Sequence, residues 1–243
     1  MATYRTLTGL NVPSVTREQM VKLDHIAIEE TGPNLYQMME NAGRNLALSA
    51  LDMINKQSSQ IRIIIIAGSG GNGGGGICAA RHLANLSDLI EICLCLSSPK
   101  KLSEAASYQR KIFSSTHGQE VSVSSLETMD AHLIIDALIG YSLNGSPTEV
   151  STKLIQWMNK QTTPILSLDI PSGIDSTTGK APGQFINATR TMTLALPKTG
   201  LLQGPTGELW LADIGIPKAA FERLNLDYTA PFAQNCLIPL EIQ

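Results

Sequence analysis

The stretch IRIIIIAGSGGNGGGGICAARHL, residues 61–83, joins an apolar run to a glycine-rich run. Five of its first six residues are isoleucine, which is typical of a strand buried on both faces of a sheet. Seven of the nine residues from Gly68 to Gly76 are glycine, and a helical pattern follows them. Glycines between a strand and a helix let a ligand approach the main chain closely. The stretch therefore predicts a buried strand that ends in a ligand-binding loop.

Apolar, strand-length runs recur along the chain. They lie at residues 89–97, 131–140, 163–173 and 190–197, with a more alternating run at 207–215. Helical patterns lie between the early runs, at residues 77–86, 102–114 and 151–160. Strands that alternate with helices predict an α/β, Rossmann-like fold with a mostly parallel sheet and helices on both faces. The late strands have short connections, so we expect the far edge of the sheet to turn antiparallel.

Two helices are expected before the first buried strand. Residues 1–15 read as an irregular N-terminal arm, and a helix should begin at Thr16, where Thr16 and Gln19 fit a capping box. A second helix should run from about Leu35 to Asn55. Because no repeat, low-complexity linker or boundary interrupts the chain, residues 1–243 are expected to form a single domain.

The composition excludes several classes of partner. The net charge is −3, and no Lys/Arg cluster is interleaved with aromatics, so neither nucleic acid nor a membrane surface is expected as a partner. The N-terminus lacks the apolar core of a signal peptide, and Cys78, Cys93 and Cys95 fall in apolar stretches. These features predict a cytoplasmic protein with reduced thiols. The histidines show no metal-ligand spacing, and His82 reads as a helix-surface residue.

Polar residues follow the ends of several expected strands. Asp136 ends one run, Asp169 ends another and begins DIPSGID, and Lys198 follows the run at 190–197. In open α/β sheets, ligands bind beyond the carboxyl ends of the strands. The two carboxylates and the lysine are therefore expected to converge near the glycine run.

Two common nucleotide-binding classes fit poorly. A P-loop requires Gly-Lys-Ser/Thr after its glycines, but the helix here opens GICAARHL without a lysine. A dinucleotide dehydrogenase requires an acidic residue at the end of the second strand, which here ends CLCLSSPK. NTP hydrolysis and ordinary NAD-dependent oxidoreduction are both disfavoured.

Several ordered motifs resemble those of the YjeF N-terminal domain family, from about residue 14 to residue 217. They are TREQMVKLDHIAIEETG, LYQMMENAGRNLA, AGSGGNGGGGICAARHL, IIDALIGYSLNG, LSLDIPSGIDSTTG, TMTLALPKTGLL and GELWLADIGIP. The resemblance implies a three-layer Rossmann-like fold, usually a homodimer. It implies an epimerase, acting on hydrated NADH and NADPH in nicotinamide nucleotide repair, that needs a separate NAD(P)HX dehydratase in trans.

The resemblance also implies site residues. Asp169 is the aspartate that contacts substrate. Because a carboxylate can both accept and donate a proton, we further expect Asp169 to act as general acid and base, with Lys198 as its electrostatic helper. The expected substrate-binding residues are Asp169, Gly71, Asn72, Gly73, Gly74, Gly75, Gly140, Tyr141, Ser142, Leu143, Asn144, Gly145 and Ser146. The family binds a potassium ion, K⁺, whose expected ligands are Asn72, Asp136 and Ser172. These residues supply the oxygen donors that hard cations prefer.

The glycine run departs from the family pattern G-x-G-N-N-G-G-D-G. Gly71 stands in place of the first Asn and Gly75 in place of the Asp, whereas Asn72 is kept. These losses motivate an alternative, a degenerate, non-catalytic member that binds a nucleotide or a protein. Retention of five further residues argues against this alternative and favours the epimerase: Asn72, Asp136, Asp169, Ser172 and Lys198.

Overall fold

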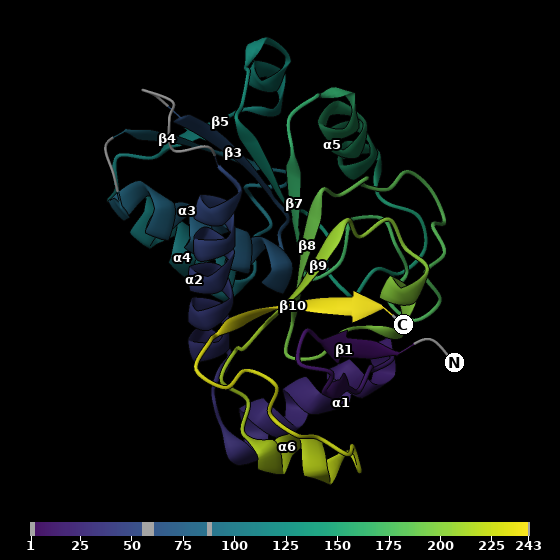
Figure 1. Cartoon of the computed structure of the whole chain (residues 1–243). Coiled ribbons are helices and arrows are strands. Elements are labelled where there is room, and N and C mark those ends of the chain that lie inside the picture. The colour runs from purple at the N-terminus through teal and green to yellow at the C-terminus, as the bar shows by residue number, and fades with distance from the viewer. Residues whose placement is uncertain (1–2, 55–60, 87–88, 243) are drawn as a thin grey trace.

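The structure, a computed structural model, describes residues 3–54, 61–86 and 89–242. Across these ranges the backbone forms a ten-stranded sheet in the order β2-β1-β10-β9-β8-β7-β6-β3-β4-β5 (Figure 1). Its parallel part consists of β3 (Ile61–Ala67), β4 (Ile90–Leu96), β5 (Gln119–Val121), β6 (Leu133–Ala137), β7 (Ile165–Leu168), β8 (Arg190–Leu194) and β9 (Glu208–Ala212). The expected mostly parallel α/β fold is confirmed.

Helices cover both faces of the parallel sheet (Figure 1). α2 (Leu35–Met53), α3 (Gly71–Leu86) and α4 (Glu104–Phe113) lie on one face, and α5 (Glu149–Lys160) lies on the other. The isoleucines of β3 alternate between the faces. Ile63 and Ile65 join the core beneath α2, α3 and α4, whereas Ile64 and Ile66 join the core beneath α5. Burial on both faces explains why this strand is apolar almost throughout.

The far edge of the sheet is antiparallel, as expected, but it is built from both ends of the chain. β10 (Leu237–Ile242) pairs antiparallel with β9, β1 (Tyr4–Thr6) with β10, and β2 (Asn11–Val12) with β1. The expectation of a wholly irregular arm over residues 1–15 is therefore wrong for these two short strands. Their partner comes from the other end of the chain, so no local pattern announces them.

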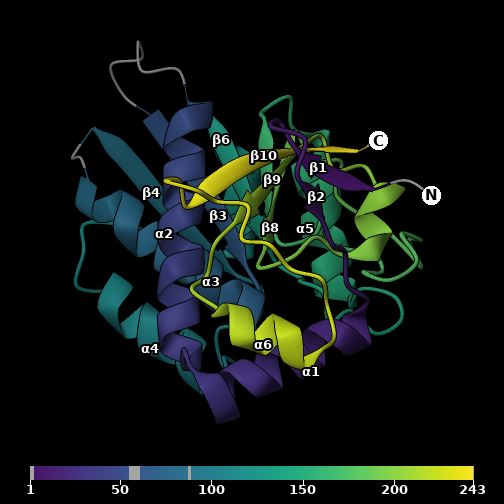
Figure 2. The same ribbon diagram turned by 60° about the horizontal axis from the view of Figure 1, so that its bottom comes forward.

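The N-terminal helices close one end of the molecule. α1 (Arg17–Ile26) begins after Thr16, whose side chain forms the expected capping box with Gln19, and a π-helical turn (Ala27–Thr31) follows. α1 contacts the short α6 (Lys218–Arg223), and Figure 2 shows the two side by side. Two 3₁₀ helices, Val123–Thr128 and Thr199–Leu202, complete the elements. The expected end of the second helix at Asn55 lies outside the described residues.

No helix in the described ranges combines the length and the apolar character that crossing a membrane requires.

The glycine run is helical, contrary to the expectation that the helix begins at residue 77. α3 begins at Gly71, so most of these glycines form its first turns. Their lack of a side chain permits close packing. A Cβ on Gly73 would lie 1.9 Å from the Gly68 carbonyl oxygen, and one on Gly76 would lie 2.4 Å from the Ala137 Cβ. Gly71 differs, because a Cβ there meets no atom of the described residues within 4 Å.

This contrast predicts opposite outcomes for two neighbouring substitutions. Gly73→Ala is expected to lower the free energy of unfolding by about 1–3 kcal/mol, because its methyl group collides with rigid backbone. Gly71→Ala, in open space on the same helix, is the matched control and is expected to be neutral or slightly stabilising. Urea unfolding of both variants measures the difference. Equal stabilities would show that α3 does not sit against residue 68 as described.

Candidate functional site

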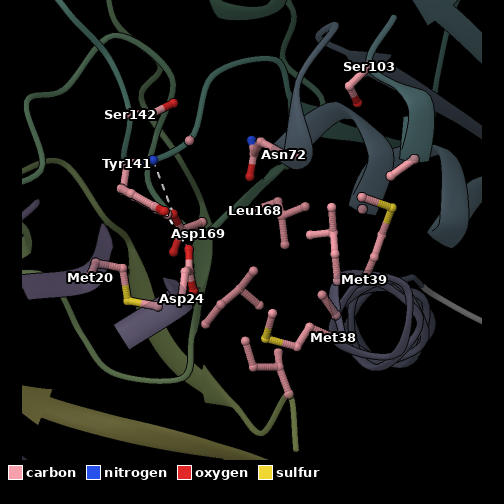
Figure 3. Close-up of a pocket in the computed structure, with 18 of the residues that line it drawn as sticks. Met20, Asp24, Met38, Met39, Asn72, Ser103, Tyr141, Ser142, Leu168 and Asp169 are labelled. Atoms are coloured by element: carbon pink, nitrogen blue, oxygen red, sulfur yellow. Dashed lines mark hydrogen bonds between the residues drawn. The ribbon is translucent and has the colours of Figure 1, made fainter. Parts of the chain in front are cut away.

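The parallel sheet has a topological switch between β3 and β6. After β3 the chain proceeds to β4 and β5 on one side, and it then returns to build β6 to β9 on the other side. Ligands of open α/β sheets bind at such a switch, beyond the carboxyl ends of the strands. α3 starts after β3, and residues 138–146 follow β6, so both segments reach this point. A cavity of about 370 Å³ lies there (Figure 3).

The cavity has apolar walls and a small polar group at one side. Its apolar lining includes Met20, Leu35, Met38, Met39, Ala42, Leu168, Leu194 and Ile214. Figure 3 shows Asp24, Tyr141 and Asp169 gathered opposite Met38 and Met39 of α2. Small-molecule sites have this form, with apolar walls for contact area and a few placed polar groups for orientation.

Asp169 and Lys198 form a buried ion pair in the cavity wall. The Lys198 ammonium binds Asp169 Oδ1, and the exposed fractions of the two side chains are 0% for Lys198 and 3% for Asp169. Lys198 Nζ also donates to the Leu194 carbonyl at 2.9 Å. The Tyr141 backbone N–H donates to Asp169 Oδ2 at 3.1 Å. Each carboxylate oxygen of Asp169 therefore accepts a separate donor while the group lines the cavity.

The backbone of Asp169 is held in an uncommon conformation. Its φ angle is +69°, in the left-handed region that L residues other than Asn and Asp seldom adopt. The Asp169 N–H donates to the Met192 carbonyl at 2.7 Å, which fixes the chain as it leaves β7. Such strain costs about 1–3 kcal/mol and gathers at functional sites. Here it turns the carboxylate toward the cavity.

Asp24 belongs to the same polar group, although its place in the sequence predicts no role for it. The Tyr141 hydroxyl donates to Asp24 Oδ2 and joins α1 to the segment after β6. Burial raises the pKa of Asp24, an effect that the Tyr141 hydrogen bond and the Lys198 charge partly offset. Asp24 lies within TREQMVKLDHIAIEETG, one of the motifs shared with the family. The motif identified this segment as part of the resemblance, but nothing in it singled out Asp24. Only the fold brings it to Tyr141.

The raised pKa of Asp24 gives a pH-dependent prediction for Asp24→Asn. The folded protein binds the Asp24 proton more tightly than the unfolded chain does, so wild type is stabilised below the ordinary pKa of 3.8. That stabilisation is lost as the pH rises through the raised folded-state pKa. The amide of the variant does not titrate, so its stability relative to wild type should increase over this range. Denaturant unfolding of both proteins at several pH values measures this difference, and a flat difference contradicts it.

Asp136 and Ser172 meet behind the cavity, and neither lines it. The Asp136 carboxylate accepts from Ser172 Oγ, from the Ser172 N–H at 2.9 Å, from Ser167 Oγ at 2.8 Å and from the Leu138 N–H at 3.2 Å. Burial raises the pKa of Asp136, and these four donors act against that effect. Ser172 Oγ also lies 3.2 Å from the Ile139 carbonyl oxygen. The structure thus brings together two of the three expected ion ligands.

Asn72, the third expected ion ligand, lies at the start of α3. Its side chain faces Gly140, where an added Cβ would lie 3.1 Å from Asn72 Oδ1. Within the described residues its buried Nδ2 has no hydrogen-bond partner. A buried, unpaired N–H donor is uncommon in proteins and indicates a missing acceptor, such as an oxygen of a ligand or a water.

The expected substrate segments reach the cavity only in part. Gly71, Asn72, Gly75, Gly140, Tyr141 and Ser142 line it. Gly73 and Gly74 instead pack against Gly68 and Met39. In the second segment, Leu143 and Gly145 border a separate hollow, and Ser146 Oγ donates to the Pro182 carbonyl at 2.9 Å. Asn144 is exposed.

Comparison with known proteins agrees with this arrangement of strand ends and cavity. The family described as YjeF-related protein N-terminus matches residues 35–200. This chain belongs to that family. The match covers α2, the helical glycine run and the segment from β6 to Lys198, which together supply most of the cavity wall. β10 and the N-terminal strands lie outside it.

Relatives of this YjeF-related chain carry more than one kind of name. It is 45% identical to an NAD(P)H-hydrate epimerase of Dehalogenimonas lykanthroporepellens over 98% of this chain and 96% of that protein. It is 31% identical to the bifunctional NAD(P)H-hydrate repair enzyme Nnr of Salinibacter ruber, of which it spans 42%. It is also 31% identical to the enhancer of mRNA-decapping protein 3 of Macaca fascicularis, of which it spans 46%.

Structural comparison supports the fold independently. The crystal structure of the yeast protein ynu0 superposes on 94% of this chain and 100% of its own, with a TM-score of 0.83. The two sequences are 20% identical, so the similarity concerns the fold.

Proposed function

We propose that this protein is an epimerase that interconverts the R and S forms of hydrated NADH and NADPH. The observation that carries the proposal is the buried Asp169–Lys198 pair, whose carboxylate lines the cavity at the topological switch. The full-length similarity to a protein named NAD(P)H-hydrate epimerase supports the substrate class. Sequence similarity alone would also suit a protein that only binds, but a buried carboxylate facing an apolar cavity supplies a reacting group.

Asp169 is suited to act first as a general base. Both of its oxygens accept hydrogen bonds, so it enters the reaction as an acceptor. The carboxylate removes the proton from the hydroxyl of the hydrated nicotinamide ring. The oxygen then forms a carbonyl as the bond from that carbon to the ring nitrogen breaks, and the nitrogen takes up the proton. Rotation of the opened chain then turns the opposite face of the carbonyl toward the nitrogen. Ring closure on that face reverses both proton transfers and inverts the configuration of the carbon. The alternative route, loss and return of the hydroxyl, requires Asp169 to act first as an acid.

Lys198 positions Asp169 and balances its charge. The ammonium is anchored by the Leu194 carbonyl at 2.9 Å, and it lies 5.8 Å from the centre of the Tyr141 ring. This anchoring holds Asp169 Oδ1 and leaves Oδ2 beside the segment that begins at Gly140. Tyr141, fixed by Asp24, places its N–H on that second oxygen.

A potassium ion fits the donors beside the cavity. The Asp136 carboxylate, the Ser172 hydroxyl and the Ile139 carbonyl lie together, and Asn72 Oδ1 faces Gly140, the residue that follows Ile139. A set made of oxygens suits a hard monovalent cation, which would add positive charge near a bound pyrophosphate and fix the start of α3. We infer that K⁺ occupies this position when substrate binds.

The test supplies hydrated NADH as the epimer that a separate dehydratase does not consume, adds that dehydratase, and follows the return of NADH absorbance. We expect recovery faster than without the protein, and faster with K⁺ than with choline as the only monovalent cation. Recovery at the uncatalysed rate in both salts would overturn the activity. Catalysed recovery at the same rate in both salts would overturn the ion site alone.

The second candidate function, a non-catalytic binding member, rests on Gly71 and Gly75 and on the relative named for mRNA decapping. Restoring the family pattern separates the two. Among the described residues, an Asn at position 71 has open space, and a Cβ at position 75 meets the terminal Leu168 Cδ2 alone, at 2.9 Å. If the native loop is active, Gly71→Asn/Gly75→Asp should change the rate only modestly. If restoration produces a rate that wild type lacks, the native chain is the degenerate form.

We further infer a homodimer and a separate NAD(P)HX dehydratase as functional partner. Exposed apolar side chains lie along α1, the π-helical turn and α2: Val21, Ile28, Leu35, Tyr36 and Leu48. Such a surface supports self-association, which sedimentation equilibrium measures. The free thiols of the four cysteines support a cytoplasmic location.

A further inference from the structure

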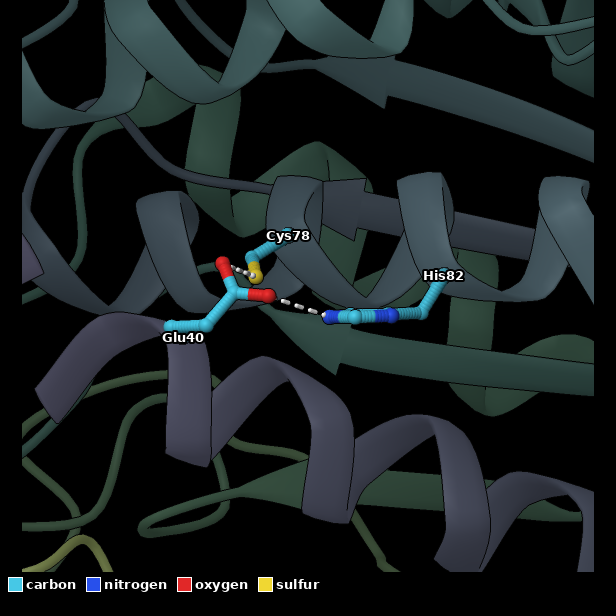
Figure 4. A group of neighbouring side chains, drawn as sticks. All are labelled: Glu40, Cys78 and His82. Carbon is cyan, nitrogen blue, oxygen red and sulfur yellow. Dashed lines mark hydrogen bonds and ion pairs between the residues drawn. The ribbon is translucent and has the colours of Figure 1, made fainter. Parts of the chain in front are cut away.

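We propose that Glu40, Cys78 and His82 form a binding site for a divalent transition metal, of which Zn²⁺ is the best match. The three residues lie between α2 and α3 and do not line the cavity (Figure 4). The inference is independent of the proposed epimerase activity.

The helices place the three donor atoms together. Cys78 and His82 are four residues apart on α3, so their side chains point to the same face of that helix. Glu40 reaches that face from α2. Glu40 Oε1 lies 2.8 Å from His82 Nε2, and Glu40 Oε2 lies 3.6 Å from Cys78 Sγ. The ligand atoms of all three residues lie within 4.8 Å of one another.

These separations are close to those of a tetrahedral site. Metal–ligand distances of about 2.0–2.3 Å place neighbouring donor atoms about 3.4–3.6 Å apart. The Cys78 thiol has this spacing from Glu40 Oε2, whereas the His82 imidazole lies closer than this to Glu40 Oε1. The side chains therefore have to adjust so that one carboxylate oxygen, the sulfur and the imidazole surround the same point. Both Glu40 and His82 have solvent-facing side chains, 44% and 24% exposed, so they have room for this adjustment.

The chemical types of the three donor atoms indicate which metal ion the site would bind. A thiolate, an imidazole and a carboxylate together suit Zn²⁺, whereas Mg²⁺ and Ca²⁺ require oxygen ligands throughout. Cys78 is fully buried and forms the floor of the proposed metal site. The solvent-facing side of the site leaves a fourth coordination position for water. When the metal binds, the Cys78 thiol releases its proton to solvent and the metal–sulfur bond replaces the S–H bond.

Arg81 lies among the three ligand residues. Its Nη2 binds Glu40 Oε2, and it lies 3.3 Å from Cys78 Sγ and 3.4 Å from His82 Nε2. The guanidinium therefore supplies the positive charge of this cluster in the metal-free protein. A metal ion that binds the three donors has to displace this long side chain toward solvent.

A metal here would hold together two walls of the cavity. α2 contributes Met38 and Met39 to the lining, and α3 contributes Gly71, Asn72 and Gly75. At Gly43 the two helices are already so close that a Cβ would lie 2.5 Å from the Cys78 sulfur. The bound ion would therefore add a cross-link at an existing close contact.

The test is titration of the reduced, chelator-treated full chain with Co²⁺ as a spectroscopic probe, and with Zn²⁺ in competition against a chromophoric chelator. We expect about one ion per chain and a sulfur-to-cobalt charge-transfer band that Zn²⁺ abolishes. Cys78→Ser should remove the band, and His82→Gln and Glu40→Gln should each weaken Zn²⁺ binding at least about tenfold. Cys78→Ser is nearly isosteric, and circular dichroism verifies its fold.

Matched controls use the same residue types elsewhere. Cys236→Ser and His25→Gln, both exposed, should leave the affinity and the band unchanged. No binding by the reduced protein would overturn the site. So would binding that survives in Cys78→Ser, or binding that Cys236→Ser abolishes.

Discussion

Lys198→Met is expected to lower the free energy of unfolding by about 3–5 kcal/mol. The methionine fills the volume of the lysine stem but leaves the Asp169 carboxylate buried without its cation. The Leu194 carbonyl loses its donor as well. A buried ion pair need not stabilise a protein overall, yet removing one partner exposes the full desolvation cost of the other.

Urea unfolding of the Lys198→Met variant measures this loss, and the double variant Asp169→Asn/Lys198→Met tests its cause. The neutral Asn can still accept the Tyr141 N–H, and it tolerates the positive φ angle of position 169. The double variant should therefore recover most of the lost stability. In a double-mutant cycle the two substitutions would then be strongly non-additive in their effect on the free energy of unfolding. Lys22→Met, at an exposed lysine of α1, should cost almost nothing. Additive losses in the double variant would contradict the paired arrangement.

Asp169→Asn should reduce epimerase turnover by about 10²–10⁴-fold, the usual contribution of a positioned acid–base group. The amide keeps the shape of the carboxylate and its hydrogen bond from Tyr141, but it does not take up the substrate proton. Because the cavity walls are unchanged, the loss should fall on kcat and much less on KM.

The coupled dehydratase assay measures this effect at a temperature where circular dichroism shows the variant folded, since Lys198 loses its partner too. Asp130→Asn is the control and should keep wild-type turnover, because Asp130 is an exposed carboxylate that does not line the cavity. Full activity in Asp169→Asn would remove Asp169 from the chemistry. A rise in KM with unchanged kcat would reduce its role to substrate binding.

The elements with a local cause could be predicted from the sequence alone. The capping box of Thr16 and Gln19 marked the start of α1, and the isoleucine run marked β3. The order of strands and helices predicted the parallel sheet, and the polar residues at the ends of β6, β7 and β8 indicated at which edge of the sheet the cavity lies. Each of these features depends on neighbours within a few residues or on a general rule for parallel sheets.

Contacts between residues that are distant in the sequence became visible only in the folded protein. β1 pairs with β10 across the length of the chain, Asp24 of α1 reaches Tyr141 after β6, and Glu40 of α2 reaches Cys78 and His82 of α3. From the sequence, the glycine run predicts a loop. The structure shows a helix that packs closely against Gly68, Ala137 and Met39, and this close packing explains why its residues are glycines. Propensity and periodicity act over a few residues. Contacts such as these depend on packing between segments that the sequence separates.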